Sequence, residues 1–247
     1  MWRRLAHKQW LIFYPLALAV IDTLAFLAVY SAAGGEIRWS AFFAANYPGE
    51  RWQFLGEHFI SGFSFTPALA VAVFVGLAVC VFSAMLRAPL FRAIAGSGYP
   101  LSPRSWEETG RLSLYYVVFY LVLAALPLAL PANTALRPAA GWIALVISLF
   151  LVYTDYVIVF EDLAFIPAIR RSARLLARRW PPALVLFIIY FAITQGLASL
   201  YARYYEAASG VFLLIPLSEI LVFSFLSLLF DLLYIFLYEH VRNAGRG

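Results

Sequence analysis

Six runs of mostly apolar residues, each about twenty residues long, constrain the fold of this chain more than any other feature. A helix of about twenty residues is long enough to cross the ~30 Å hydrocarbon core of a bilayer. No run shows the period-two alternation of a membrane β-barrel strand, so each is predicted to be a transmembrane helix. The six predicted spans are residues 10–33, 65–86, 112–130, 139–160, 183–203 and 211–238.

The composition indicates an integral membrane protein. Of the 247 residues, 64% are hydrophobic and 13% are charged, and the mean hydropathy is +0.84. Soluble domains contain about 25% charged residues, so this chain has too little polar surface to cover a water-soluble body. The connections between the runs are too short for a separate domain. We therefore expect residues 1–247 to form one all-α, polytopic transmembrane bundle.

The basic residues predict the orientation of this bundle. Of the 18 Lys and Arg residues, 14 fall in the N-terminus, the second and fourth connections and the C-terminus. Basic residues favour the cytoplasmic side of a membrane. Because the asymmetry alternates strictly across six spans, it predicts that both termini are cytoplasmic. The longest outer connection, 36–64, is rich in aromatic residues; we expect a cap at the headgroup level, with a ligand-binding lid as the alternative.

The fourth connection, FEDLAFIPAIRRSARLLARRWPP, is strongly basic. Its helical spacing separates an arginine stripe from an apolar stripe, which predicts an amphipathic helix at about 162–180 lying on anionic headgroups. Glu161 and Asp162 stand at the start of this segment, where carboxylates favour the helix dipole and pair with arginines of neighbouring segments. The arginines of the segment are Arg170, Arg171, Arg174, Arg178 and Arg179.

The alternative partners of this basic segment are a nucleic acid and a calmodulin-like protein. The predicted topology turns the arginines toward lipid headgroups, and no nucleic-acid-binding motif accompanies them, so we expect no nucleic-acid partner. A calmodulin-like target helix would have to leave the bilayer. Lipid anchoring is therefore the preferred interpretation.

The second connection is a weaker version of the fourth. Arg87 precedes, and Arg92 lies within, a segment at about 88–97 that is also predicted to be amphipathic. Both units have the order span, basic segment, span, in the same orientation. An internal duplication is one explanation and chance similarity is the other.

The two cytoplasmic segments, LRAPLFRAIAGSG and ED followed by AIRRSARLLARRW, resemble bacterial six-span proteins related to the membrane domain of glycerophosphoryl diester phosphodiesterase. Where that membrane domain precedes a phosphodiesterase, the chemistry belongs to a soluble catalytic domain. The resemblance therefore implies a membrane scaffold in the bacterial plasma membrane and not an enzyme.

Acidic residues inside the predicted spans are candidates for a polar site. Asp22 and Glu219 lie within spans one and six, with Gln195 as a possible polar neighbour. Ionised groups at the bilayer centre cost about 2.5–3.5 kcal/mol on insertion scales, so these side chains should face the bundle interior. They either join helices through hydrogen bonds or line a path for a proton or cation.

Two further acids, Asp155 and Asp231, lie closer to the predicted cytoplasmic surface. A carboxylate at this depth is within reach of basic side chains at the same interface. We expect both to form ion pairs with arginines there, for example Arg87 or Arg170.

No catalytic, metal or cofactor motif is present. The three histidines are scattered, and P-loop, GxSxG and HExxH sequences are absent. Cys80, the single cysteine, lies in an apolar run and is predicted to be a small buried hydrophobic residue. It belongs to a stripe of small residues that would allow close helix packing: Ala68, Ala72, Gly76, Cys80 and Ala84.

The expected function is that of a non-enzymatic membrane scaffold or accessory subunit in envelope or transport processes. A membrane-protein partner or an ATPase would be its protein partner. The alternative is a small transporter or channel subunit that uses the intramembrane carboxylates. A lipid-processing enzyme is the third possibility.

Overall fold

A computed structural model describes residues 9–32, 67–95, 103–129, 137–207 and 214–243. The outer segment 36–64, for which an aromatic cap was predicted, lies outside these residues. Every regular element in the described part is helical. The elements are η1 (Gln9–Ile12), α2 (Phe13–Ala32), α5 (Pro67–Ala95), α6 (Pro103–Ala129), α7 (Arg137–Phe150), α8 (Thr154–Glu161), α9 (Phe165–Arg178), α10 (Trp180–Ala207) and α11 (Leu214–Asn243).

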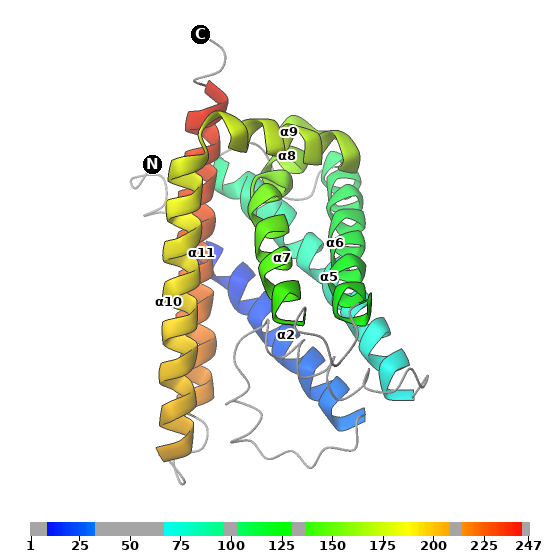
Figure 1. Ribbon diagram of the computed structural model, residues 1–247, viewed down its shortest axis with the longest axis vertical. Helices are drawn as coiled ribbons and strands as arrows, with labels where there is room; N and C mark the ends of the chain where they lie inside the picture. The colour runs from blue at the N-terminus through cyan, green and yellow to red at the C-terminus, as the bar shows by residue number, and fades with distance from the viewer. Residues whose placement is uncertain (1–8, 33–66, 96–102, 130–136, 208–213, 244–247) are drawn as a thin grey trace.

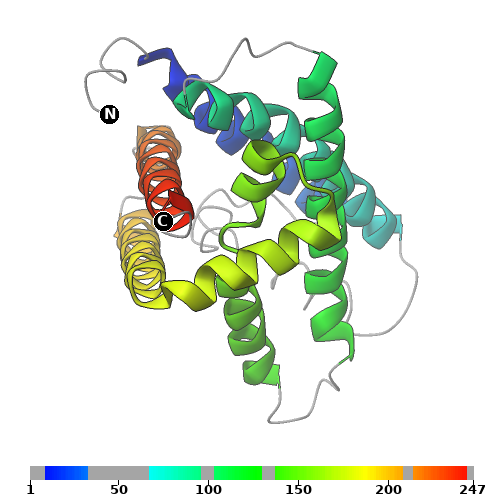
Figure 2. The same ribbon diagram turned by 90° about the horizontal axis from the view of Figure 1, so that it is seen from above.

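The long helices alternate in direction along the chain (Figure 1). α10 and α11 stand side by side as an antiparallel pair, and α2 and α5 cross the bundle obliquely. α9 lies across the upper end of the bundle, where α5 and α11 end and α6 and α10 begin. Seen from above, α9 extends from α10 to α6, and α8 lies inside this arc (Figure 2).

Four of the described helices are long and apolar enough to cross a membrane, which is compatible with an integral membrane protein. They coincide with the predicted spans one, two, five and six, so the all-helical class and these four apolar helices are confirmed. The four segments are Trp10–Val29, Val73–Ala95, Trp180–Tyr201 and Leu217–Asn243.

Predicted span four differs from the structure, because residues 139–160 do not form one continuous helix. α7 ends at Phe150, a turn occupies residues 151–153, and α8 begins at Thr154. The break contains no proline or glycine, the usual causes of an interrupted helix. Contacts from another segment must therefore impose it.

α8 is the most enclosed element of the fold. Four consecutive residues of this helix are buried, so its apolar side chains are enclosed on every side of the helix. These residues are Tyr156, Val157, Ile158 and Val159. A short helix that is apolar on all sides is stable only inside a core. α8 therefore forms a central plug, which packs against α5, α6 and α9.

The segment 88–97 also differs from its prediction. Residues 88–95 continue α5 without a break, although Pro89 lies inside the helix. Leu90 and Phe91 are buried, with exposures of 2% and 0%, because they pack against the central core. The described part of this segment is thus core helix and not a separate surface element.

The predicted small-residue stripe makes one close helix approach. Gly76 is buried on α5, and the ring of Tyr120 on α6 occupies the space that a Cβ atom would take. α5 packs extensively on α6, and the missing side chain of Gly76 lets the aromatic ring reach the α5 backbone. In contrast, Gly110 on α6 has no atom within 4 Å of its Cβ position.

We expect Gly76→Ala to lower the thermal stability and Gly110→Ala to leave it unchanged or raise it. Both changes gain up to about 1 kcal/mol of helix propensity, but only the first also displaces a packed ring, for which overpacking costs about 1–3 kcal/mol. Stability is measured by the temperature at which the buried Cys80 thiol reacts with a fluorogenic dye. Equal shifts in the two variants would contradict the close approach at Gly76.

Candidate functional site

A partly buried ion pair joins α5 to α8. Arg87 Nη1 lies 3.5 Å from Asp155 Oδ2, and the Tyr116 hydroxyl of α6 donates a hydrogen bond of 2.7 Å to the same carboxylate oxygen. Three helices therefore meet at one carboxylate. The predicted pairing of Asp155 with Arg87 is confirmed, whereas the other suggested partner, Arg170, is exposed on α9.

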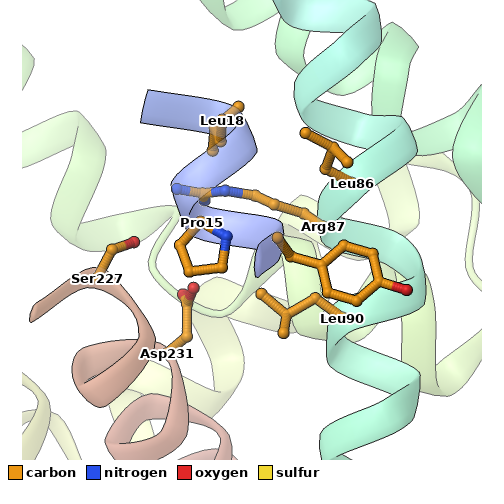
Figure 3. A pocket seen from close by; sticks show the side chains of 8 residues that line it. Pro15, Leu18, Leu86, Arg87, Leu90, Ser227 and Asp231 are labelled. Atoms are coloured by element: carbon orange, nitrogen blue, oxygen red, sulfur yellow. The ribbon is translucent and has the colours of Figure 1, made fainter. Parts of the chain in front are cut away.

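Asp231 of α11 brings a second carboxyl group to Arg87. Its exposure is 8%, and the Tyr156 hydroxyl donates to Asp231 Oδ1 at 3.3 Å. Arg87 and Asp231 line the same small pocket, so Arg87 lies beside this carboxyl as well as beside Asp155. In Figure 3, Arg87 extends from α5 toward α2, and the Asp231 carboxyl points from α11 toward Pro15 of α2. We call Arg87, Asp155 and Asp231 the ion cluster.

A small pocket borders the ion cluster where α2, α5 and α11 meet (Figure 3). Its cavity volume of about 10 Å³ is close to the lower limit for holding a single water molecule. In this conformation the pocket is therefore too small for an organic solute. It is lined by Tyr14, Pro15, Leu18, Leu86, Arg87, Leu90, Ser227 and Asp231.

Further ion pairs fasten the upper end of the bundle. Arg92 of α5 pairs with the buried Glu108 of α6. Arg111 of α6 reaches the turn after α8, where it bonds the Asp162 carboxylate and donates to the Asp162 carbonyl oxygen at 2.8 Å. Asp162 has a left-handed φ of 56° and ends α8.

The acidic pair therefore does not start the basic helix as expected. Glu161 is the last residue of α8, and α9 begins only at Phe165. Glu161 accepts two hydrogen bonds from Arg171 of α9, at 2.9 and 3.3 Å, and a third from the Tyr238 hydroxyl of α11 at 2.9 Å. It thus joins three helices.

The arginines of α9 lie on two different faces of the helix. Arg171 turns inward to Glu161, whereas Arg170, Arg174 and Arg178 are exposed, and no carboxylate of the described residues pairs with them. Arg179 is also exposed, and its guanidinium lies 3.0 Å from His240 Nε2 at the end of α11. We call Arg170, Arg174, Arg178 and Arg179 the outer arginines.

The buried face of α9 accounts for the break between α7 and α8. The Ser172 hydroxyl donates to the Phe150 carbonyl oxygen at 2.9 Å and accepts a hydrogen bond from the Tyr153 N–H at 3.2 Å. In a continuous helix these two backbone groups would bond within the helix itself. Ser172 supplies a substitute partner for both, so the chain can turn there without leaving buried polar groups unsatisfied.

The other predicted polar site is distributed over three helices. Asp22 is half-buried on α2, Glu219 is buried at 5% exposure on α11, and Gln195 is half-buried on α10. Asp22 and Glu219 both have an interaction partner in the structure. Within the described residues, no group of three or more His, Cys, Asp or Glu side chains could hold a metal ion.

The polar side chains that complete the site were not predicted from the sequence. Tyr116 and Tyr156 bond carboxylates 39 and 75 residues away in the chain, and Ser172 reaches back 19 residues to Tyr153. Tyrosine and serine are ordinary residues in membrane helices, so nothing in the local sequence distinguishes these three. A search of protein-family models, curated proteins and solved structures finds no match to this chain.

We expect Ser172→Ala to destabilise the protein by about 1–3 kcal/mol, because it leaves the Phe150 carbonyl and the Tyr153 N–H without a partner in a buried place. The matched control is Ser199→Ala, which removes an exposed hydroxyl from α10. Thermal release of the Cys80 thiol reports both variants. If Ser172→Ala behaved like the control, Ser172 would not hold the helix break.

The Arg87–Asp155 pair is testable by a double-mutant cycle with Arg87→Gln and Asp155→Asn. The two side chains are 31% and 15% exposed, so removing one partner strands the other charge in a partly buried place. The double variant should therefore cost clearly less than the sum of the single variants. The control cycle is Arg111–Glu107, a pair of 3.7 Å in which Glu107 is 70% exposed. Its coupling should be about 0–1 kcal/mol, and equal coupling in the two cycles would contradict a buried ion cluster.

Proposed function

We propose that this protein is a non-enzymatic integral membrane scaffold or accessory subunit of the bacterial plasma membrane, with six spans and cytoplasmic termini. The contrast between its two sets of charges carries this proposal. Interior carboxylates are held by arginines and tyrosines of neighbouring helices, whereas the outer arginines carry unneutralised charge at the surface of α9. The interior is built for holding helices together, and the surface of α9 is built for binding.

The alternating helix directions support the six-span topology. α6 would be span three, and α7 with α8 would together be span four, although α8 is a buried plug. In Figure 1 the C-terminal ends of α5 and α11 and the N-terminal ends of α6 and α10 lie at the same end of the bundle as α9. The basic residues of these ends include Arg92, Arg111 and Arg242. Basic residues at one end of a bundle favour the cytoplasmic side.

The proposed partner of α9 is the anionic headgroup layer of the cytoplasmic leaflet. Its buried face consists of Ala168, Ser172, Leu175 and Leu176, so the helix lies flat on the bundle and the outer arginines are exposed on its other face. Each arginine near an anionic membrane surface contributes about 1 kcal/mol. The exposed Trp180 at the start of α10 would anchor this end at the interface.

The resemblance to the membrane domain of glycerophosphoryl diester phosphodiesterase is consistent with a scaffold. In such proteins the membrane domain carries no chemistry of its own. A membrane-protein partner or an ATPase would then supply the activity that this bundle organises.

The transporter alternative requires a polar path to Asp22 and Glu219. Both acids have interaction partners in the structure, which favours the scaffold. A flux assay in liposomes tests the alternative: movement of protons or cations by the wild type that Glu219→Gln abolishes would replace the scaffold proposal. A lipid-processing enzyme has no supporting arrangement in the described residues.

We expect anionic lipid to stabilise the detergent-solubilised protein through the outer arginines. Phosphatidylglycerol should raise the temperature of Cys80 release, and phosphatidylcholine should not, because ligand binding to the folded state shifts unfolding. The variant Arg170→Gln/Arg174→Gln/Arg178→Gln should lose most of this shift. Added salt should weaken the shift in the wild type, since exposed charges are screened.

The control variant is Arg203→Gln, which removes an exposed arginine near the opposite end of α10. It should retain the full response to phosphatidylglycerol. An equal response of the triple variant and the control would show that α9 is not the lipid-binding surface.

A further inference from the structure

The ion cluster contains one more negative charge than positive charge when all three groups are ionised. Arg87 contacts Asp155 at 3.5 Å and lines one pocket together with Asp231, so two carboxyl groups share the positive charge of one arginine. Other nearby arginines are engaged elsewhere: Arg92 with Glu108 and Arg111 with Asp162. An uncompensated charge in a site enclosed by helices is costly.

We propose that the ion cluster is a proton-binding site and that Asp231 holds the proton. One added proton makes the cluster neutral without any movement of the helices. Two carboxyl groups that share one neutralising charge titrate as a pair, so the proton belongs to the cluster as a whole and resides mainly on the carboxyl with the weaker partners.

The hydrogen bonds assign the proton to Asp231 and not to Asp155. Asp155 has the arginine contact at 3.5 Å and the Tyr116 hydrogen bond at 2.7 Å, both of which stabilise a carboxylate. Asp231 has a longer hydrogen bond of 3.3 Å from Tyr156. Asp231 also lines the pocket together with Ser227, so its carboxyl borders a place where a proton or a water molecule can arrive.

A metal cation fits this place less well than a proton. A cation needs several oxygen ligands around it, and the cavity of about 10 Å³ has room for at most about one water molecule. Arg87 lines the same pocket and would repel a second cation. A proton needs neither space nor further ligands.

Among the described residues, the other titratable groups around Asp231 are tyrosines, which do not compete for the proton. They are Tyr14 of α2, Tyr156 of α8, Tyr190 of α10, and Tyr234 of α11, the helix that carries Asp231 itself. Tyrosine hydroxyls ionise only near about pH 10 and arginine stays protonated. Between pH 4 and 8, the two carboxyls are therefore the groups of this cluster that change charge.

Infrared difference spectroscopy of the full-length protein in liposomes tests the site, because a protonated carboxyl has a C=O stretching band that a carboxylate lacks. The wild-type minus Asp231→Asn spectrum should contain this band at pH 6, well above the range of about pH 4 in which exposed carboxyls titrate, and raising the pH should remove it. Asp231→Glu should keep the band. Glu107→Gln, at an exposed carboxyl, should leave the band unchanged.

Charge counting also predicts the neighbouring variants. Asp155→Asn should lose the band, because Arg87 then neutralises Asp231 alone. Arg87→Gln should roughly double it, because both carboxyls then require a proton. The proposal is overturned if the wild-type minus Asp231→Asn spectrum lacks the band above pH 5, or if sodium or potassium ions remove the band at constant pH, which would indicate a cation site.

Discussion

The partly buried charge of Arg87 is the constraint on which the packing of this bundle depends. A guanidinium among apolar helices is stable only if carboxylates of other helices reach it, because an isolated charge is far costlier in an apolar medium than in water. α8 supplies Asp155 and α11 supplies Asp231, so both helices must approach α5 at one depth. This requirement explains why the short α8 lies at the centre of the bundle and why tyrosine hydroxyls from α6 and α8 complete the polar contacts.

α9 connects this interior to the surface through its two faces. On the inner face, Ser172 holds the backbone at the turn before α8, and Arg171 binds Glu161 at the end of α8. On the outer face, Arg170, Arg174 and Arg178 are free of carboxylate partners among the described residues. Through the contacts of its inner face, α9 fixes both ends of α8, the helix that carries Asp155.

Part of the site was predictable, because the position of a charged residue within an apolar run can be read from the sequence alone. A charged side chain within an apolar run is costly, so the sequence predicts that Asp155 pairs with a nearby arginine. In the structure that arginine is Arg87. Arg170 was an equally good candidate by depth, and only the direction of α9 turned it outward. Tyr116, Tyr156 and Ser172 were not predictable, since their roles arise from contacts between distant parts of the chain.

The sequence by itself determined the all-helical class, the four long apolar helices and the amphipathic pattern of residues 165–178, since hydropathy and helical periodicity depend only on neighbours in the chain. The tertiary structure decided where a helix stops and which charges meet. Residues 139–160 form an uninterrupted apolar run, yet Ser172 divides them at Phe150 and Tyr153. Residues 88–95 carry basic side chains, yet they continue α5 into the core because Leu90 and Phe91 are buried there. In both cases a distant segment supplies the hydrogen bonds or apolar contacts, and local sequence contains no record of it.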